Sequence, residues 1–281
     1  MKLKLGYFVL IMTAIIAFTG CTGKEENATA LIQTAQEKMG EITSLQAKMN
    51  MNVKMNMDSE EIATVTTADI SAFREPMKMK LAVSSYMEND PSQKNIVEMY
   101  LQENDAGVTA YSNAGTGWVC TKPEKESLGQ FEVYDNVLRY LSTMENPVSK
   151  GTEKIGEVST KRVEGILTGE TMEQIIEESG ILNSALNVGI TEEELQGMYS
   201  EINGLPVTLW IGADGLVYQY ETDISQLVQI VMDKTIELMG TDQVDEGTSV
   251  TIQEAKISML CSDFNAVQDF EIPAEALAAK Q

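Results

Sequence analysis

The sequence feature that most constrains the fold is a strict alternation of apolar and polar side chains from Ala47 to Asp58. Its apolar members after Ala47 are Met49, Met51, Val53, Met55 and Met57. A period of two is typical of an extended strand with one buried face, because successive side chains point to opposite sides. A second run with the same period contains Met77, Met79, Leu81 and Val83. Both runs predict strands of an antiparallel sheet with one apolar face.

The rest of the chain adds helices and hairpins to this sheet. Further strands are predicted at 64–73, 95–102, 107–112, 117–121, 161–167, 205–211, 216–221 and 250–260. Helical periodicity predicts a first helix capped by Thr29, and others near 134–144, 172–180, 191–199 and 224–239. The apolar face of the last strand switches between Ile252 and Ile257, which indicates a β-bulge. Since no linker-like segment interrupts this pattern, we expect a single α+β domain spanning 29–281.

The N-terminus has the pattern of an export signal. Lys2 and Lys4 precede an apolar run from Leu5 to Phe18, and Thr19-Gly20 lead into Cys21. This end resembles the lipobox of bacterial lipoproteins, although Phe18 stands where leucine is usual. The resemblance implies removal of residues 1–20, acylation of Cys21 and a short tether over 21–28. The alternative is an uncleaved membrane anchor, but a spanning helix needs about 20 apolar residues. Either way, we expect the domain at the extracytoplasmic face of the cell membrane.

Charge and the absence of histidine exclude several function classes. The chain has 20 Lys+Arg against 43 Asp+Glu, and loss of Lys2 and Lys4 with the signal leaves 18 against 43, a formal charge of −25. Such an acidic protein repels nucleic acid. With no histidine, the chain lacks Ser-His-Asp and Cys-His catalysis and the usual zinc sites. We therefore expect a non-enzymatic protein without a cofactor or metal site.

Cys120 and Cys261 are the two cysteines that remain beyond Cys21. Both lie in predicted strands, and an exported protein can keep a disulfide between them. The alternative is that each is a small buried side chain, as free cysteines commonly are.

The apolar strand faces are the candidate binding surface. Its residues are Met49, Met51, Val53, Met55, Met57, Met77, Met79, Leu81 and Val83. Flexible thioethers suit a cavity that adapts to different acyl chains. Two alternatives are an ordinary core packed against the helices and a Cu(I) site, which needs three or four converging thioethers.

Several segments resemble the LolA/LppX-like lipoprotein superfamily. They are the N-terminal pattern, the first helix, the long alternating strands, the Gly115–Trp118 turn and a helix starting near Gln130. The stretches Leu205–Ile211 and Glu271–Leu277 are also similar to an uncharacterised family of Gram-positive surface lipoproteins. The resemblance implies an open antiparallel half-barrel wrapped around helices, with an apolar concavity that holds acyl chains in LolA-like carriers. It carries no catalytic residues.

Two functions follow as hypotheses. The first is a membrane-anchored lipoprotein that binds or carries a lipid-like hydrophobic ligand. The second is a non-catalytic envelope interaction module with an ordinary packed core. An apolar concavity of roughly 300 Å³ or more distinguishes the carrier from the module.

Overall fold

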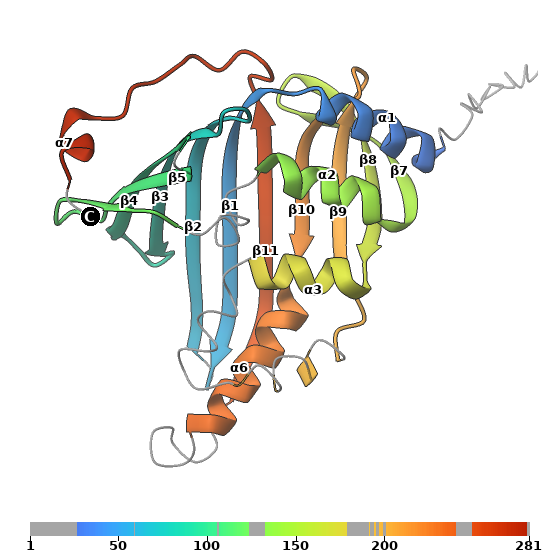
Figure 1. Ribbon diagram of the computed structural model, residues 1–281. Helices are drawn as coiled ribbons and strands as arrows, with labels where there is room; N and C mark the ends of the chain where they lie inside the picture. The colour runs from blue at the N-terminus through green and yellow to red at the C-terminus, as the bar shows by residue number, and fades with distance from the viewer. Residues whose placement is uncertain are drawn as a thin grey trace, which may run out of the picture.

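A computed structural model describes residues 27–58, 60–105, 107–123, 133–178, 191, 194, 197–198, 201–239 and 249–279. Within these residues, one antiparallel sheet runs in the order β6-β5-β4-β3-β2-β1-β11-β10-β9-β8-β7 (Figure 1). The strands are β1 Ser44–Met57, β2 Glu60–Phe73, β3 Lys78–Met87, β4 Asp90–Asn104, β5 Gly107–Asn113, β6 Trp118–Thr121, β7 Glu145–Ile155, β8 Val158–Leu167, β9 Leu205–Gly212, β10 Val217–Asp223 and β11 Val250–Ser262. The helices are α1 Ala28–Gly40, α2 Val133–Thr143, α3 Gly169–Glu178, α6 Ser225–Met239 and α7 Ala274–Leu277.

The sheet consists of two meanders that meet at its centre. One meander runs outward from β1 to β6, and the other comprises β7 to β11. They are joined by β1 and β11, where Met49 pairs with Met259. The register between these strands shifts between Lys54 and Met55, so the bulge predicted near Ile252 is confirmed. Because β6 and β7 are edges that do not pair with each other, the sheet is an open half-barrel, and the predicted fold class is confirmed.

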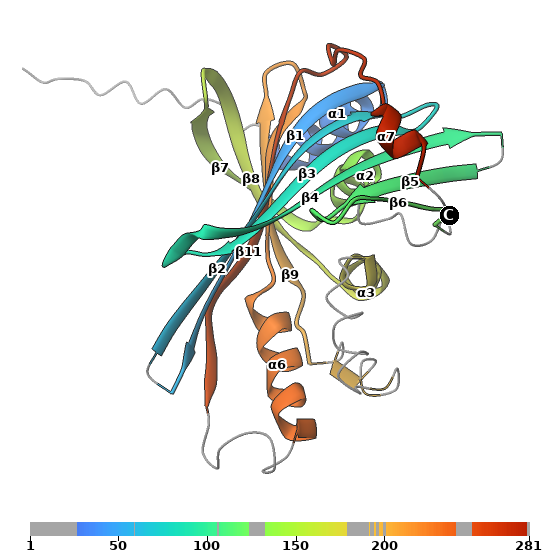
Figure 2. The same cartoon turned by 90° about the vertical axis from the view of Figure 1, so that its left-hand side faces the viewer.

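The inner face of the sheet is the one that carries Leu45, Ala47 and Met49, and the helices pack on it. Figure 1 shows α2 and α3 crossing in front of β8 to β11, and Figure 2 shows both on the same side of the sheet. Inner side chains such as Leu209 and Met259 form one core with α2 residues such as Val137. An amphipathic helix and a sheet with one apolar face must each bury that face, and here they do so together.

Helix α1 begins two residues earlier than the sequence predicts. Its cap is Asn27, whose Oδ1 accepts a hydrogen bond of 3.1 Å from the Thr29 amide. Thr29 was expected as the cap, but Asn27 has the preferred side chain and places its acceptor over the first turn. The helix buries Ala28, Ile32, Ala35 and Met39 at helical spacing.

The C-terminal segment from Asp263 to Ala279 crosses the opposite, outer face of the sheet. The Phe270 ring lies 6.0 Å from that of Phe73 and 6.2 Å from that of Tyr100. Lys78 pairs with Asp269, and its Nζ lies 4.8 Å from the Phe270 ring centre. The segment ends in α7, which lies beside β5 and β6 (Figure 2).

Candidate functional site

The predicted apolar face changes character along the length of its strands. Met79 and Leu81 are 2% exposed and belong to the core. Met49, Met51, Val53, Met77 and Val83 are half-buried and pack against that core. Met55 is also half-buried, but Met57 at the strand end is 38% exposed. The alternation therefore marks a single face, which is packed at one end and accessible at the other.

Neighbouring strands extend this half-buried surface sideways. Across the register, Leu81 of β3 pairs with Met99 of β4, and Met51 of β1 pairs with Ile257 of β11. Met99, Ile252 and Ile257 are likewise only partly buried against the core. The result is an apolar strip that crosses the middle of the sheet on its inner side.

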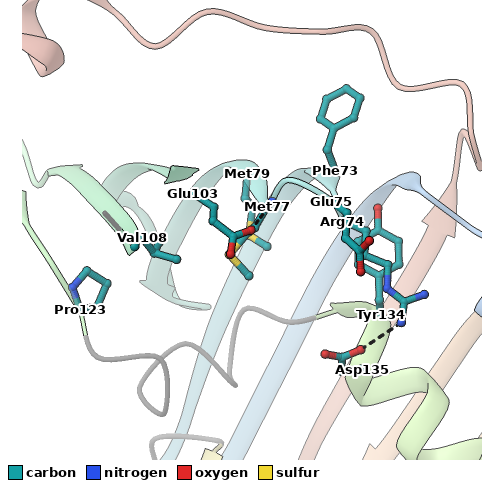
Figure 3. A pocket seen from close by; sticks show the side chains of 11 residues that line it. Phe73, Arg74, Glu75, Met77, Met79, Glu103, Val108, Pro123, Tyr134 and Asp135 are labelled. Carbon is teal, nitrogen blue, oxygen red and sulfur yellow. Dashed lines mark hydrogen bonds and ion pairs between the residues drawn. The ribbon is translucent and has the colours of Figure 1, made fainter. Parts of the chain in front are cut away.

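At the upper end of β3, the apolar face opens into a cavity of about 600 Å³ (Figure 3). Met77, Met79 and Val108 contribute apolar lining from β3, its preceding turn and β5. The remaining described lining residues are Phe73, Arg74, Glu75, Glu103, Gly107, Pro123, Tyr134 and Asp135. Pockets that hold small apolar ligands are typically about 300–1,000 Å³, so the cavity has the size expected of a carrier, but its lining is apolar only in part.

Polar side chains form the rim of this cavity. Arg74, in the turn between β2 and β3, donates to the Gly40 carbonyl at 3.1 Å and lies 3.5 Å from the Asp135 carboxylate of α2. Its guanidinium carbon is 5.9 Å from the Tyr134 ring centre. Glu103 Oε2 accepts a bond of 2.9 Å from the Met77 amide. The rim thus joins α2 to the β2–β3 turn and the end of β4.

Tyr134 is a fixed part of the cavity wall. Its hydroxyl donates to the Ala72 carbonyl at 2.8 Å, and the side chain is buried. Burial raises the pKa of Tyr134 far above its usual value, because the charged phenolate is poorly solvated there. Tyr134 therefore stays neutral and acts as a wall rather than as an acid or base.

The cavity includes two of the nine residues predicted to form it. Met77 and Met79 line it, whereas the other seven do not belong to its lining. Those two thioethers are fewer than the three or four that a Cu(I) site needs. The rim residues Arg74, Glu75 and Asp135 were missed because they lie in a turn and a first helical turn, where no strand periodicity points to a face.

A second hollow, of about 510 Å³, lies between α1 and the hairpins β7–β8 and β9–β10. Its lining includes the hydroxyl side chains of Thr34, Thr152, Ser159 and Thr160. Thr34 and Thr160 already donate to the carbonyls of Ala30 and Glu153. Two of these four hydroxyl groups therefore already form hydrogen bonds with nearby backbone carbonyls.

The disulfide expected as one alternative is wrong, since Cys120 and Cys261 are both free and buried. Cys120 lies on β6 and Cys261 on β11, with five strands between them. At about 4.8 Å per strand, the separation along the sheet is roughly 29 Å, whereas bridged Cα atoms lie within about 7 Å. Burial raises the pKa of the Cys261 thiol to about 12. Both cysteines are therefore small core side chains, as the other alternative predicted.

The predicted signal peptide and the acylated Cys21 lie outside the described residues. None of the described helices is both long and apolar enough to cross a membrane. The described residues also contain no group of three or more His, Cys, Asp or Glu side chains placed to hold a metal ion.

Comparisons with known proteins agree on the fold. Residues 27–133 match a family of unknown function, DUF6612. Lipoprotein LppX of Mycobacterium tuberculosis matches with a TM-score of 0.51 and 16% identity, over 87% of this chain and 98% of LppX. LprF of Mycobacterium bovis matches with a TM-score of 0.50 and 13% identity, over 88% and 97% of the two chains. No curated protein matches. The fold is thus similar to that of LppX and LprF, as the predicted resemblance implied, while membership of the Gram-positive family stays a prediction.

Proposed function

We propose that the protein is a membrane-anchored extracytoplasmic lipoprotein that binds or carries a lipid-like hydrophobic ligand on the inner face of its sheet. The observation that carries this proposal is that two accessible apolar features share one face of the sheet. The half-buried strip that includes Met49 and Met51 lies on the same inner face of the sheet as the cavity lined by Met77 and Met79. Solvent-accessible apolar surface of this kind is costly unless something covers it.

Thioethers suit the proposed cargo. Methionine is unbranched and polarisable, so Met77 and Met79 adjust to the changing outline of an acyl chain at little cost. Val108, Phe73 and Tyr134 also contribute to the cavity lining. Binding without a catalytic step agrees with the absence of histidine from the sequence.

The membrane anchor is a separate part of the proposal and depends on the lipobox at Cys21. The structural neighbour LppX is itself a lipoprotein, which supports this part. A diacylglyceryl group supplies two acyl chains, and two chains hold a protein stably on a bilayer.

Binding is tested by titrating a neutral fluorescent apolar probe, N-phenyl-1-naphthylamine, into a chain that begins at Thr22. This chain contains every described helix and strand. We expect saturable binding of the probe. Val108→Trp should fill the cavity and weaken binding by at least about tenfold, or about 1.4 kcal/mol. The matched control is Val148→Trp, because Val148 is 50% exposed and lies on β7 at the opposite edge of the sheet.

Saturable binding that Val108→Trp weakens and Val148→Trp leaves unchanged supports the cavity as the binding site. Binding that both variants leave unchanged overturns this assignment. If the probe does not bind at all, the carrier function is wrong and the envelope interaction module replaces it.

A further inference from the structure

The rim of the 600 Å³ cavity has an unequal charge balance. Among its described lining residues, Glu75, Glu103 and Asp135 are acidic and Arg74 is basic. Figure 3 shows Glu103 beside Met77 and Met79, and Arg74 and Glu75 beside Tyr134 with Asp135 close to Arg74. A ligand whose chain lies on the thioethers must place its polar end among these four groups.

Arg74 already makes three contacts within the protein. It donates to the Gly40 carbonyl at 3.1 Å, pairs with Asp135 at 3.5 Å and lies against the Tyr134 ring. The pair cancels the charges of Arg74 and Asp135 to first order. An anionic headgroup would therefore have to compete with Asp135 for the guanidinium, and binding there would leave that carboxylate without its cation.

Among the described residues, two carboxylates at the rim have no cation paired with them. Glu75 is exposed and forms no ion pair with any described residue. Glu103 Oε2 accepts from the Met77 amide, and Glu103 forms no ion pair with any described residue. The positive end of the α2 dipole also lies at this rim, but Asp135 in the first turn offsets it.

The Glu103 carboxylate is close to the apolar lining. Glu103 Oε2 is 2.9 Å from the amide nitrogen of Met77, whose thioether lines the cavity. A positive group at Glu103 can therefore be joined directly to a chain that lies on Met77 and Met79. The acidic balance of the chain, 43 Asp+Glu against 20 Lys+Arg, adds a long-range field of the same sign.

We propose that this cavity selects amphiphiles with a cationic, amine- or ammonium-bearing head, which Glu75 and Glu103 bind at the rim while the chain lies on Met77 and Met79. This selectivity rests on the proposed function, because it names the class of hydrophobic ligand that the carrier takes. Anionic amphiphiles of equal chain length bind more weakly, because they meet uncompensated carboxylates and an arginine that is already paired.

The test is competition against the neutral probe by three compounds with the same twelve-carbon chain, each used below its micelle concentration. The compounds are dodecyltrimethylammonium, dodecanol and dodecyl sulfate. The two exposed carboxylates should favour the cationic compound over dodecanol by about tenfold, with dodecyl sulfate the weakest. Added salt should reduce the differences in affinity among the three compounds.

A pair of double variants assigns the preference to the rim. In Glu75→Gln/Glu103→Gln, the ratio of dodecyltrimethylammonium to dodecanol affinity should fall to about one. Glu61→Gln/Glu88→Gln removes the same charge from exposed positions outside the cavity lining and should keep the preference. If the control lowers the preference as much, the general field of the protein causes it and the rim assignment is wrong.

The possible failures are distinguishable from one another. If none of the three compounds displaces the probe, the proposed function fails. If all three compete equally, the carrier function stands and the headgroup selectivity is wrong. If dodecyl sulfate competes best, Arg74 dominates the rim and the selectivity has the opposite sign.

Discussion

The two halves of the sheet are built from the same kind of strand but are filled differently. In β8 to β10, inner residues such as Val163, Leu209 and Val217 are completely buried. In the lower part of β1, inner residues such as Met51, Val53 and Met55 are half-buried. The difference shows that alternation defines a face, whereas the helices that reach that face determine whether it becomes core.

Contacts with α2 illustrate how the packed half is closed. Tyr140 of α2 meets Tyr220 of β10 edge-to-face with ring centres 5.3 Å apart, a favoured arrangement for buried aromatic rings. Strand β1, by contrast, continues down to Met57 beyond the level of α2 (Figure 1). The lower part of β1 therefore has apolar inner side chains like those of the core, but α2 does not cover them.

The largest effect expected from this difference is on stability. Leu209→Ala removes a completely buried side chain and should lower the free energy of unfolding by about 2–5 kcal/mol. Met55→Ala shortens a half-buried side chain and should cost under about 1 kcal/mol. Urea unfolding measures both values, and similar losses would show that the two halves are packed alike.

A smaller effect is expected from the C-terminal segment on the outer face. Phe270→Ala removes the ring that contacts Phe73 and Tyr100 and should cost about 1–2 kcal/mol. Because Phe73 also lines the cavity, amide exchange should rise more in β2 to β4 than in β8 to β10. Leu277→Ala, at a 56% exposed position of the same segment, is the control, and equal exchange in both variants would contradict this role.

A pH-dependent effect is expected on the outer face of the packed half. Trp210 Nε1 donates to Glu153 Oε2 at 2.7 Å, and this bond, together with Arg162, holds the pKa of Glu153 below its ordinary value of 4.5. A depressed folded-state pKa stabilises the protein above the unfolded-state pKa, and this contribution is lost as pH falls through the folded-state value.

Glu153→Gln should therefore be less stable than the unchanged chain near pH 7, and the two should converge as pH drops below 4.5. Thermal unfolding measured from pH 7 to pH 3 checks this expectation. A stability difference that stays constant across this range would show that the carboxylate charge is not responsible.

The smallest effect concerns the cysteines. Cys261 is completely buried, and its pKa is raised to about 12, so the reactive thiolate is scarce at pH 8. In a chain that begins at Thr22, neither Cys120 nor Cys261 should react with a thiol reagent until urea unfolds the protein. The intact mass should be the same with and without reductant. A difference of about two mass units would show that the two cysteines form a disulfide.

Much of the sheet could be predicted because its strands have one buried and one solvated face. The alternation in β1 and β3, the bulge in β11 and the Asn113–Gly117 turn are all present, and the Asn113 side chain accepts from the amides of Gly115 and Gly117. At the start of the helix predicted near 191–199, Thr191 and Glu194 form a capping box with reciprocal bonds of 2.9 and 3.3 Å.

Strand β7 could not be predicted in the same way. Pro147, which follows the helix predicted near 134–144, lies within β7 at the edge of the sheet. An edge strand tolerates proline because one side of its backbone needs no partner. The strand is mostly exposed, and its register shifts twice, so no period of two marks it.

The cavity was predicted only in its apolar part. Met77 and Met79 follow from strand periodicity, but Arg74, Glu75 and Asp135 reach the rim only through the packing of α2 beside the β2–β3 turn. Contacts between residues this far apart in sequence depend on tertiary structure, which local patterns do not encode.

The central proposal is that the cavity lined by Met77, Met79 and Val108 on the inner face holds a hydrophobic ligand. Its most direct test is native mass spectrometry of the protein purified from the envelope of its own host, followed by solvent extraction and identification of what is released. We expect a stoichiometric amphiphile that is lost in the Val108→Trp variant. A clean apo mass under conditions that keep the chain folded would contradict the claim.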